Sequence, residues 1–307
     1  MPTPAPPPSC CASLRQTLLH GWLQDFPLHP SPFRQMAARS GATPRELLAT
    51  CRDLHRSGAL QTIRVRWGAA MRHQHWRLAF EPGTTAASLC AALARLPGCS
   101  RIEQAEGGEA MSTVWAEIDA LDEAALQRQL DRLPQRPSAR LRLPALPDED
   151  TRPCEDPALA ASIERGLSLC SKPYADCAKR LGCSEHRVLA HLQAWRRSGQ
   201  LEYLMLKPPP TRVPQSGLIA LWRQFQPSPE LLARLEAHCN VDRVVSGQGG
   251  PEWPWRLSLV LRAAPRLARE QLRELQADVG LTEAPESCAA LLIHQPRDQA
   301  LLFDTED

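Results

Sequence analysis

Two spacings of hydrophobic residues alternate along the chain, and together they predict an α+β fold. Helices are predicted where apolar residues recur every three to four positions, as at Leu272 and Leu275. Strands are predicted where apolar residues occupy every second position, as at Leu257, Leu259 and Leu261. In each half of the chain the elements follow the order strand-helix-strand-strand-helix-strand, which is the ferredoxin-like arrangement.

The two ferredoxin-like units are predicted to have the same order of elements. In the first unit, strands are expected at residues 75–81, 99–105, 112–119 and 139–146, and helices at 85–96 and 123–133. In the second unit, strands are expected at 217–225, 241–247, 255–263 and 288–295, and helices at 229–239 and 265–279.

A segment that occurs twice in the sequence precedes each ferredoxin-like unit. Residues 32–60 align without a gap on residues 173–201, and ten of the twenty-nine positions are identical. In both copies a glycine, followed two residues later by Thr43 or Ser184, separates two amphipathic stretches. This pattern predicts a helix-turn-helix whose second helix is capped by a hydroxyl group. A strand at 63–72 is predicted to follow the first copy.

The chain is therefore predicted to be one unit duplicated and fused. Each copy is expected to form a winged helix-turn-helix and a ferredoxin-like domain, and the halves are expected to pair about a pseudo-twofold axis as a pseudo-dimer. Two separate sheets are expected to share a core, so a single continuous sheet would contradict this prediction. The expected divisions are a disordered proline-rich tail (1–12), helix-turn-helix 1 (13–66), ferredoxin-like domain 1 (67–146), an acidic proline-containing linker (147–157), helix-turn-helix 2 (158–207), ferredoxin-like domain 2 (208–298) and a tail (299–307).

Composition, charge and cysteine spacing exclude several classes of protein. Hydrophobic residues make up 43% and charged residues 23%, as in a globular protein, and no apolar run is long enough to predict a membrane span. The first nine residues hold five prolines and no basic side chain, so we expect no signal peptide and a cytoplasmic location. A formal net charge of +2 disfavours nucleic acid as a partner. The eleven cysteines include no Cys-x-x-Cys pair, so free thiols and no metal site are expected.

Basic side chains gather on the strand after the first repeat and just beyond it. They are Arg64, Arg66, Arg72, His73, His75 and Arg77. Arginine binds a carboxylate through two parallel hydrogen bonds, and histidine can donate a proton near neutral pH. Alternation places Arg64 and Arg66 on one face, with Arg72 on that face and His73 opposite unless the turn at Gly68 resets the register. Arginines on a strand that follows a helix-turn-helix usually form a wing that faces solvent or contacts phosphate, and this alternative stays open here.

Three short motifs occur in the order, and on the predicted elements, that characterise one enzyme family. They are Phe26-Pro27-Leu28 with Pro32-Phe33, then Arg64-x-Arg66-Trp67-Gly68 followed by Arg72-His73, and finally Trp253-Pro254-Trp255-Arg256-Leu257. Over roughly residues 13–296 the chain resembles the siroheme decarboxylases, which share their architecture with the leucine-responsive regulators of transcription.

The resemblance implies a carboxy-lyase that removes carbon dioxide from two acetate side chains of siroheme. The product would be didecarboxysiroheme, on the route to d-type haem or in alternative haem synthesis. Siroheme is the substrate, and no separate cofactor is implied. Homologous subunits or self-association are the implied protein partners. The implied catalytic residues are His73, Arg72 and Arg66. The implied substrate-binding residues are Arg64, His75, Arg77, Arg243, Trp253, Trp255 and Arg256.

The two copies depart from the family pattern in opposite ways. The second copy has neither histidine nor paired arginines on its matching strand at 204–210, and the first copy lacks the tryptophan-proline motif before its third strand. We therefore expect one pocket, formed by the arginine-histidine strand of the first copy and closed by residues 253–256.

Two alternatives remain, a leucine-responsive transcription regulator and a non-catalytic partner subunit. The second helix of each repeat opens with an acid, Glu46 or Glu185, beside a base, which disfavours contact with DNA.

Overall fold

The computed structural model describes residues 14, 18, 25–81, 85–106, 114–144, 150–207, 215–262, 267–296 and 301–303. The expected tail at 1–12, residues 147–149 of the expected linker and residues 299–300 and 304–307 of the expected second tail lie outside these ranges. The chain divides into two compact units, and each unit contains segments from both copies. Unit 1 is Met1–Arg72, Leu146–Pro210 and Leu302–Asp307, and unit 2 is His73–Ala145 and Thr211–Leu301.

Unit 1 holds both helix-turn-helix motifs, as the repeat predicts. Thr43 accepts a hydrogen bond from the backbone N–H of Glu46 at 3.2 Å, and the Glu46 carboxylate accepts one from the N–H of Thr43 at 2.8 Å. Ser184 caps the other motif by accepting from the N–H of Arg187 at 3.2 Å. The acid at Glu46 therefore serves the helix cap. The described elements of unit 1 are α2 (Pro32–Ser40), α3 (Pro44–Arg56), β1 (Thr62–Trp67), α6 (Pro157–Arg165), α7 (Pro173–Arg180), α8 (Glu185–Arg197) and β6 (Leu201–Lys207).

The strands that follow the two motifs pair with each other. β1 and β6 form an antiparallel two-stranded sheet, from Thr62 opposite Lys207 to Trp67 opposite Leu201. Along β1 the buried residues Ile63, Val65 and Trp67 alternate with residues that are more exposed. The hydrophobic side of this small sheet packs into unit 1, so the wing strands of the two copies belong to one core.

A buried carboxylate in unit 1 binds the backbone of residues 302 and 303. Glu164 on α6 accepts hydrogen bonds from the indole N–H of Trp67 at 2.8 Å and from the backbone N–H groups of Leu302 and Phe303 at 2.7 and 2.6 Å. The Phe303 ring lies edge-on to Trp67, with 5.4 Å between the ring centroids. Three donors satisfy the buried charge, which would otherwise be costly.

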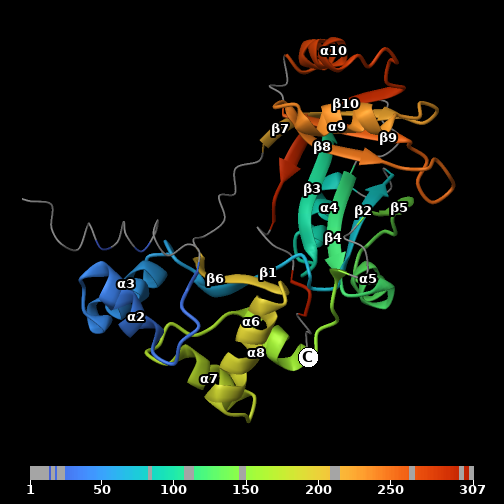
Figure 1. The fold of residues 1–307 in the computed structure, drawn as a ribbon. Coiled ribbons are helices and arrows are strands. Elements are labelled where there is room, and N and C mark those ends of the chain that lie inside the picture. The colour runs from blue at the N-terminus through green and yellow to red at the C-terminus, as the bar shows by residue number, and fades with distance from the viewer. Residues whose placement is uncertain are drawn as a thin grey trace, which may run out of the picture. The chain divides into compact units, whose positions relative to one another are not determined.

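Unit 2 holds the predicted ferredoxin-like domains, and each of the two has the predicted order of elements. The described elements are β2 (Gln74–Phe80), α4 (Ala86–Leu93), β3 (Cys99–Glu106), β4 (Val114–Ala120), α5 (Glu123–Leu130), β5 (Ala139–Arg142), β7 (Gln215–Trp222), α9 (Pro229–Ala237), β8 (Val241–Ser246), β9 (Leu257–Arg262), α10 (Ala268–Val279) and β10 (Ser287–His294). Figure 1 shows the strands of the first copy in cyan and green and those of the second in orange and red.

The expectation of two separate sheets is wrong. The strands form one sheet in the order β5-β2-β4-β3-β10-β7-β9-β8, because β3 pairs antiparallel with β10 from Glu106 opposite Ala290 to Ile102 opposite His294. Both strands are at the edge of their own half, where unpaired backbone N–H and C=O groups are available for a new ladder. We call β5-β2-β4-β3 the first half-sheet and β10-β7-β9-β8 the second half-sheet.

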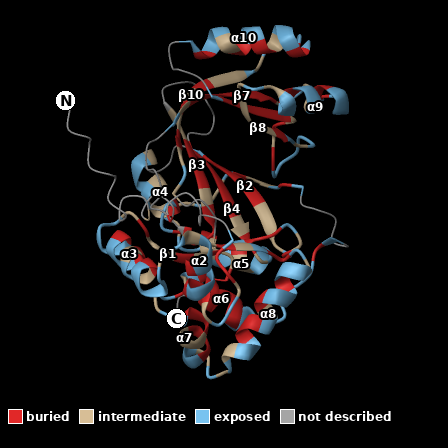
Figure 2. Ribbon diagram, turned by 60° about the vertical axis from the view of Figure 1, so that its left-hand side comes forward, coloured by how far each residue is buried: buried red, intermediate tan, exposed pale blue. Residues whose placement is uncertain are grey.

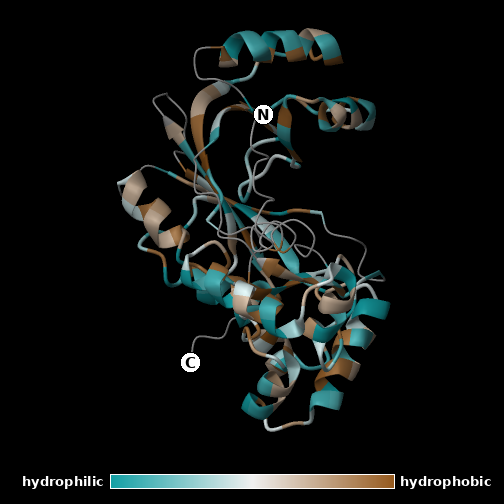
Figure 3. Cartoon of the chain, turned by 90° about the vertical axis from the view of Figure 1, so that its left-hand side faces the viewer, coloured by the Kyte–Doolittle hydropathy of each residue, from teal (hydrophilic) through white to brown (hydrophobic). Residues whose placement is uncertain are grey.

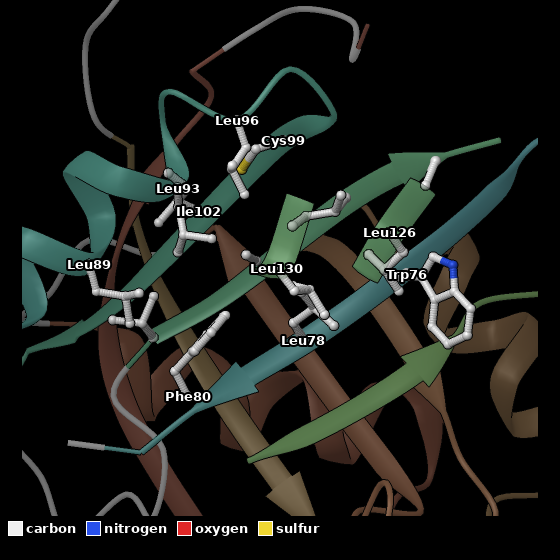
Figure 4. Close-up of a cluster of buried hydrophobic side chains, with 14 residues drawn as sticks. Trp76, Leu78, Phe80, Leu89, Leu93, Leu96, Cys99, Ile102, Leu126 and Leu130 are labelled. Atoms are coloured by element: carbon white, nitrogen blue, oxygen red, sulfur yellow. The ribbon is translucent and has the colours of Figure 1, made fainter. Parts of the chain in front are cut away.

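Each half-sheet has an outer hydrophobic core under its own helices. In the first half-sheet, Trp76, Leu78 and Phe80 pack with Leu89 from α4 and Leu126 from α5, and Figure 4 shows these side chains gathered on one side of the strands. The second half-sheet has the same arrangement under α9 and α10. Figure 3 shows hydrophilic colour over much of α10, at the top of that view.

The inner faces of the two half-sheets share a third core, as predicted. Trp115 and Ala79 from the first half-sheet pack in one cluster with Ile219, Val260 and Leu291 from the second. The sheet therefore bends back so that its halves face each other, and the backbone N–H of Arg140 on β5 donates to the carbonyl of Glu252 at 2.7 Å. The strands carry most of the red, buried positions of unit 2 in Figure 2.

Two further features of the structure are the state of the cysteines and the length and polarity of the helices. The nine cysteines within the described ranges have free thiols, as expected. Among the described residues, the helices are too short or too polar for any of them to cross a membrane.

Candidate functional site

The segment of basic residues divides at a turn. β1 ends at Trp67, and the chain turns at Gly68 before β2 begins. The N–H of Gly68 donates to the carbonyl of Gln200 at 2.8 Å, and a Cβ at Gly68 would lie 2.0 Å from the carbonyl oxygen of Gly199. Only glycine fits this approach of two backbones. The turn resets the strand register, so the alternation of β1 does not extend to His73.

Arg64, Arg66 and Arg72 lie in unit 1, where each contacts a different group. Arg64 and Arg66 lie on one face of β1, as alternation predicts. Arg64 donates to the backbone carbonyl of Glu164. Arg66 is half exposed, and its Nε lies 2.7 Å from the Glu202 carboxylate. Arg72 donates to the Thr151 hydroxyl at 3.3 Å.

The histidines after the turn lie in unit 2, on the inner face of the first half-sheet. His75 on β2 is directly opposite Asp119 on β4, and Arg77 is opposite Glu117. The Nδ1 of His75 lies 2.6 Å from the Asp119 carboxylate, and its Nε2 lies 3.4 Å from the Glu117 carboxylate. His73 directly precedes β2, and its Nε2 lies 3.9 Å from the same Asp119 oxygen.

Deeper on this face the charges are fully enclosed. Arg77 has no exposed side-chain surface, and it lies 3.0 Å from Glu117 and 2.5 Å from Glu103. Arg101 on β3 binds Glu103 from the other side at 2.5 Å. Buried charges are tolerated when they are paired and hydrogen-bonded, and here each carboxylate meets at least two cationic groups.

The second half-sheet completes this arrangement. Arg243 on β8 pairs with Glu117, and Asp242 pairs with Arg101. Arg262 on β9 binds Asp242 at 2.7 Å. We name the whole set the charged cluster. It comprises His73, His75, Arg77, Arg101, Glu103, Glu117, Asp119, Asp242, Arg243 and Arg262.

The cluster fixes the charge states of its members. Burial alone would lower the pKa of His75, but hydrogen bonds and charge attraction from Asp119 and Glu117 outweigh it and raise that pKa to about 9. Burial would raise the pKa of Glu117, but His75, Arg77 and Arg243 hold it below its usual range. His75 is therefore cationic and Glu117 anionic at neutral pH.

One end of the charged cluster is open to solvent. The side chains of His73 and Asp119 are 31% and 16% exposed, whereas those of Glu117 and Arg77 are 2% and 0% exposed. A substrate could therefore reach the histidine end of the cluster, while Arg77 and Glu117 are enclosed.

The equivalent face of the second half-sheet carries different chemistry. Both halves have a bulge at the same place, between Cys99 and Arg101 on β3 and between Val241 and Arg243 on β8. When the two halves are aligned on these bulges, Arg101 and Arg243 occupy equivalent positions, so both halves have an arginine there. The other positions change from His75 to Gly217, from Arg77 to Ile219, from Glu103 to Val245, from Glu117 to Val260 and from Asp119 to Arg262.

The tryptophan motif lies in the shared core. Trp253 and Trp255 are buried there edge to face, with 4.8 Å between their ring centroids. Arg256 lies at the surface and donates to the side chain of Gln226. The structure thus brings His73, His75, Arg77 and Arg243 into one cluster. The predicted residues outside it are Arg64, Arg66, Arg72, Trp253, Trp255 and Arg256.

The acids of the cluster were not among the residues predicted from the sequence. Glu117 and Asp119 alternate with Ala116, Ile118 and Ala120, and this pattern predicts a strand with one polar face turned to solvent. The polar face is buried only because the second half-sheet covers it. Within the described ranges, no group of three or more histidine, cysteine, aspartate or glutamate side chains is arranged to hold a metal ion.

Comparisons with known proteins agree on one family. Residues 156–201 match the siroheme decarboxylase NirDL-like HTH domain. A siroheme decarboxylase NirDL subunit from Paracoccus denitrificans is 27% identical over 317 residues, covering 87% of this chain and 90% of that subunit. A siroheme decarboxylase NirD subunit from Pseudomonas aeruginosa is 32% identical over 124 residues, covering 40% of this chain and 80% of that subunit.

Solved structures show the same fold. The crystal structure of the siroheme decarboxylase NirDL has a TM-score of 0.63 and 16% identity, covering 92% of this chain and 90% of that one. A second structure of a siroheme decarboxylase NirDL, in co-complex with an iron-uroporphyrin III analogue, has a TM-score of 0.63 and 15% identity, covering 95% of this chain and 94% of that one.

Proposed function

The chain belongs to the siroheme decarboxylase family, and we infer from this membership that it is a carboxy-lyase that acts on siroheme. We propose further that it removes carbon dioxide from two acetate side chains to give didecarboxysiroheme, for the synthesis of d-type haem or for alternative haem synthesis. Homologous subunits or a second copy of the chain are the proposed protein partners, and the cytoplasm is the proposed location.

The chemistry of each step sets what the protein must supply. The bond between the acetate methylene carbon and its carboxylate breaks, and carbon dioxide leaves. The bonding electrons pass to the methylene carbon and are delocalised into the conjugated macrocycle. One proton then binds to this carbon and gives a methyl group. The protein must hold the substrate carboxylates and deliver one proton for each carbon dioxide released.

The charged cluster is the observation that supports this function best. It places a histidine, His73, at its exposed end beside a carboxylate, and we propose that His73 donates the proton. Arg64, Arg66 and Arg72 are proposed to bind carboxylates of the macrocycle, because a guanidinium group stays charged and matches a carboxylate in shape. Arg72 directly precedes His73 in the chain.

Of the remaining residues predicted to bind substrate, we propose that all but Arg256 support the site instead. Arg77 and Arg243 are both bound to Glu117, so we propose that they hold this carboxylate in place. Trp253 and Trp255 are proposed to support the inner face through the shared core. Arg256 is proposed to bind substrate from the surface.

The direct test is anaerobic incubation of the purified protein with siroheme, followed by mass spectrometry of the tetrapyrrole. The expected result is a mass lower by two molecules of carbon dioxide. Siroheme that binds and is recovered intact would contradict the proposed activity. A His186→Ala variant, changed at an exposed histidine on α8, serves as the matched control and should react as the wild type does.

A further inference from the structure

Both nitrogens of the His75 ring face carboxylates. Nδ1 lies 2.6 Å from Asp119, and Nε2 lies 3.4 Å from Glu117. An ionised carboxylate only accepts hydrogen bonds, so each ring nitrogen must carry a proton for both contacts to form. The geometry therefore requires the imidazolium form of His75, with each of its N–H groups directed at an acid.

The surroundings of His75 keep this arrangement in place. Glu117 is bound at the same time by Arg77 from β2 and by Arg243 from β8. On the other side of β2, strand β5 places Leu141 on the inner face, while Arg140 and Arg142 are opposite the outer residues Leu78 and Trp76. Glu117 and Asp119 of β4 are thus the charged groups that face His75. Arg77, Arg243 and His73 lie beyond these two acids.

Asp119 is shared between the two histidines. The oxygen that binds His75 is also the one that lies 3.9 Å from Nε2 of His73. His75 lies between two acids, whereas His73 is near the open end of the charged cluster. The two rings are therefore inequivalent, although only Gln74 separates the two residues in the chain.

We propose that Asp119 is the positioning residue of the site and that it gives the two histidines different tasks. Its carboxylate holds His75 as a fixed imidazolium that retains its protons, and the fixed carboxylate in turn orients His73 as the ring that exchanges a proton with the substrate. This inference deepens the proposed function and rests on it for the role of His73. The protonation state of His75 can be measured without substrate.

The first test is nuclear magnetic resonance of the histidine rings in the full-length protein, with His75 assigned by its loss in a His75→Gln variant. In the wild type both nitrogens of His75 should be protonated at pH 7.5. The Asp119→Asn variant keeps the size of the side chain and removes its charge, and it should lower the titration midpoint of His75. Asp119→Glu keeps the charge and should hold the midpoint near that of the wild type.

A matched control separates this role from a general effect of removing an acid. Asp131 lies in the same half of unit 2, at the end of α5, and its carboxylate is half exposed and 3.8 Å from Arg136. Asp131→Asn should leave the His75 midpoint unchanged. Thermal unfolding of every variant checks that the fold is intact.

The second test is turnover of siroheme as a function of pH. We expect Asp119→Asn to lower turnover by roughly 10- to 100-fold and to shift the pH profile, with binding of siroheme retained. A neutral His75 ring in the wild type at pH 7.5, or an unchanged midpoint in Asp119→Asn, would overturn the positioning role. If the wild type fails to decarboxylate siroheme while the resonance results hold, the proposed function fails and the arrangement of the rings stands.

Discussion

The two half-sheets of unit 2 have the same strand order and the same bulge, but their inner faces differ in chemistry. In the first half-sheet, Arg77 and Glu117 form a buried ion pair. At the equivalent positions of the second half-sheet, Ile219 and Val260 pack in the shared hydrophobic core. An apolar pair gives stable packing, whereas a buried ion pair has a desolvation cost that its attraction barely offsets. The second half-sheet shows that the fold does not need these charges, so their presence in the first half-sheet points to a role in the site.

The largest effect on stability is expected when Glu117 of the first half-sheet is replaced by valine, the residue type at the equivalent position of the second half-sheet. Glu117→Val would remove one buried carboxylate partner from each of His75, Arg77 and Arg243, and we expect it to lower the free energy of unfolding by about 3–5 kcal/mol. For comparison, a conservative change in the second half-sheet at the position equivalent to Arg77, Ile219→Val, should cost only about 0.5–1.5 kcal/mol. Urea unfolding followed by circular dichroism measures both. Equal losses would show that the two faces are energetically alike.

Removing the ion pair as a whole should cost less than removing one partner. In the double variant Arg77→Ile with Glu117→Val, no buried arginine is left at this position with one of its two carboxylates, Glu103 and Glu117, missing. We expect it to recover roughly 1–3 kcal/mol of the loss seen in Glu117→Val, because the two changes interact. The same urea titrations test this. A double variant less stable than Glu117→Val would contradict the view that the charges serve the site rather than the fold.

The stability of the first half-sheet should depend on pH through His75. Its pKa is raised from 6.5 to about 9 in the folded protein, so its contribution is full below about pH 6.5 and is lost as the pH rises through 9. The pKa of Glu117 is lowered, so its contribution is full above its ordinary value, about 4.3, and falls in acid. We expect a loss on the order of 1–3 kcal/mol between pH 6.5 and 10.

Thermal melting at a series of pH values measures this dependence. In a His75→Gln variant the decline above pH 7 should become shallower, because the titrating ring is absent. A His186→Ala variant should keep the full decline. If His75→Gln and the wild type lose stability in parallel up to pH 10, the ring does not titrate as described.

The smallest effect is expected at the position where the second half-sheet carries Arg262 in place of Asp119. The Arg262 side chain is 66% exposed and pairs with Asp242 at its edge. Arg262→Ala should therefore change the free energy of unfolding by less than about 1 kcal/mol, as is usual for an exposed ion pair. A urea titration that shows a loss of several kcal/mol would mean that this half also depends on a charged network.

Much of the fold could be predicted from local patterns. The strand expected at 75–81 is found at Gln74–Phe80, and the helix expected at 123–133 is found at Glu123–Leu130, because alternation and three-to-four spacing record which side of each element is buried. The hydroxyl caps at Thr43 and Ser184 are also local features and were found where expected. The pairing of β3 with β10 was not predicted, because it joins edge strands almost two hundred residues apart.

The candidate site was predicted only in part, for the same reason. The histidines and arginines could be identified because several basic residues follow one another on a short segment. Glu103, Glu117 and Asp119 looked like solvent-facing residues of ordinary strands. Their burial depends on Arg243 and the second half-sheet, which no local pattern reveals. The turn at Gly68 depends on the close approach of Gly199 in the other copy.

The first copy is proposed to carry the chemistry, and one measurement tests this assignment directly. Siroheme turnover and siroheme binding should be compared in His73→Ala, from the first copy, and in Lys207→Ala, from the matching strand of the second copy. We expect His73→Ala to bind siroheme and to turn it over ~100-fold or more slowly than the wild type, the effect of losing a general acid, and Lys207→Ala to remain active. Full activity in His73→Ala together with loss of activity in Lys207→Ala would contradict the assignment.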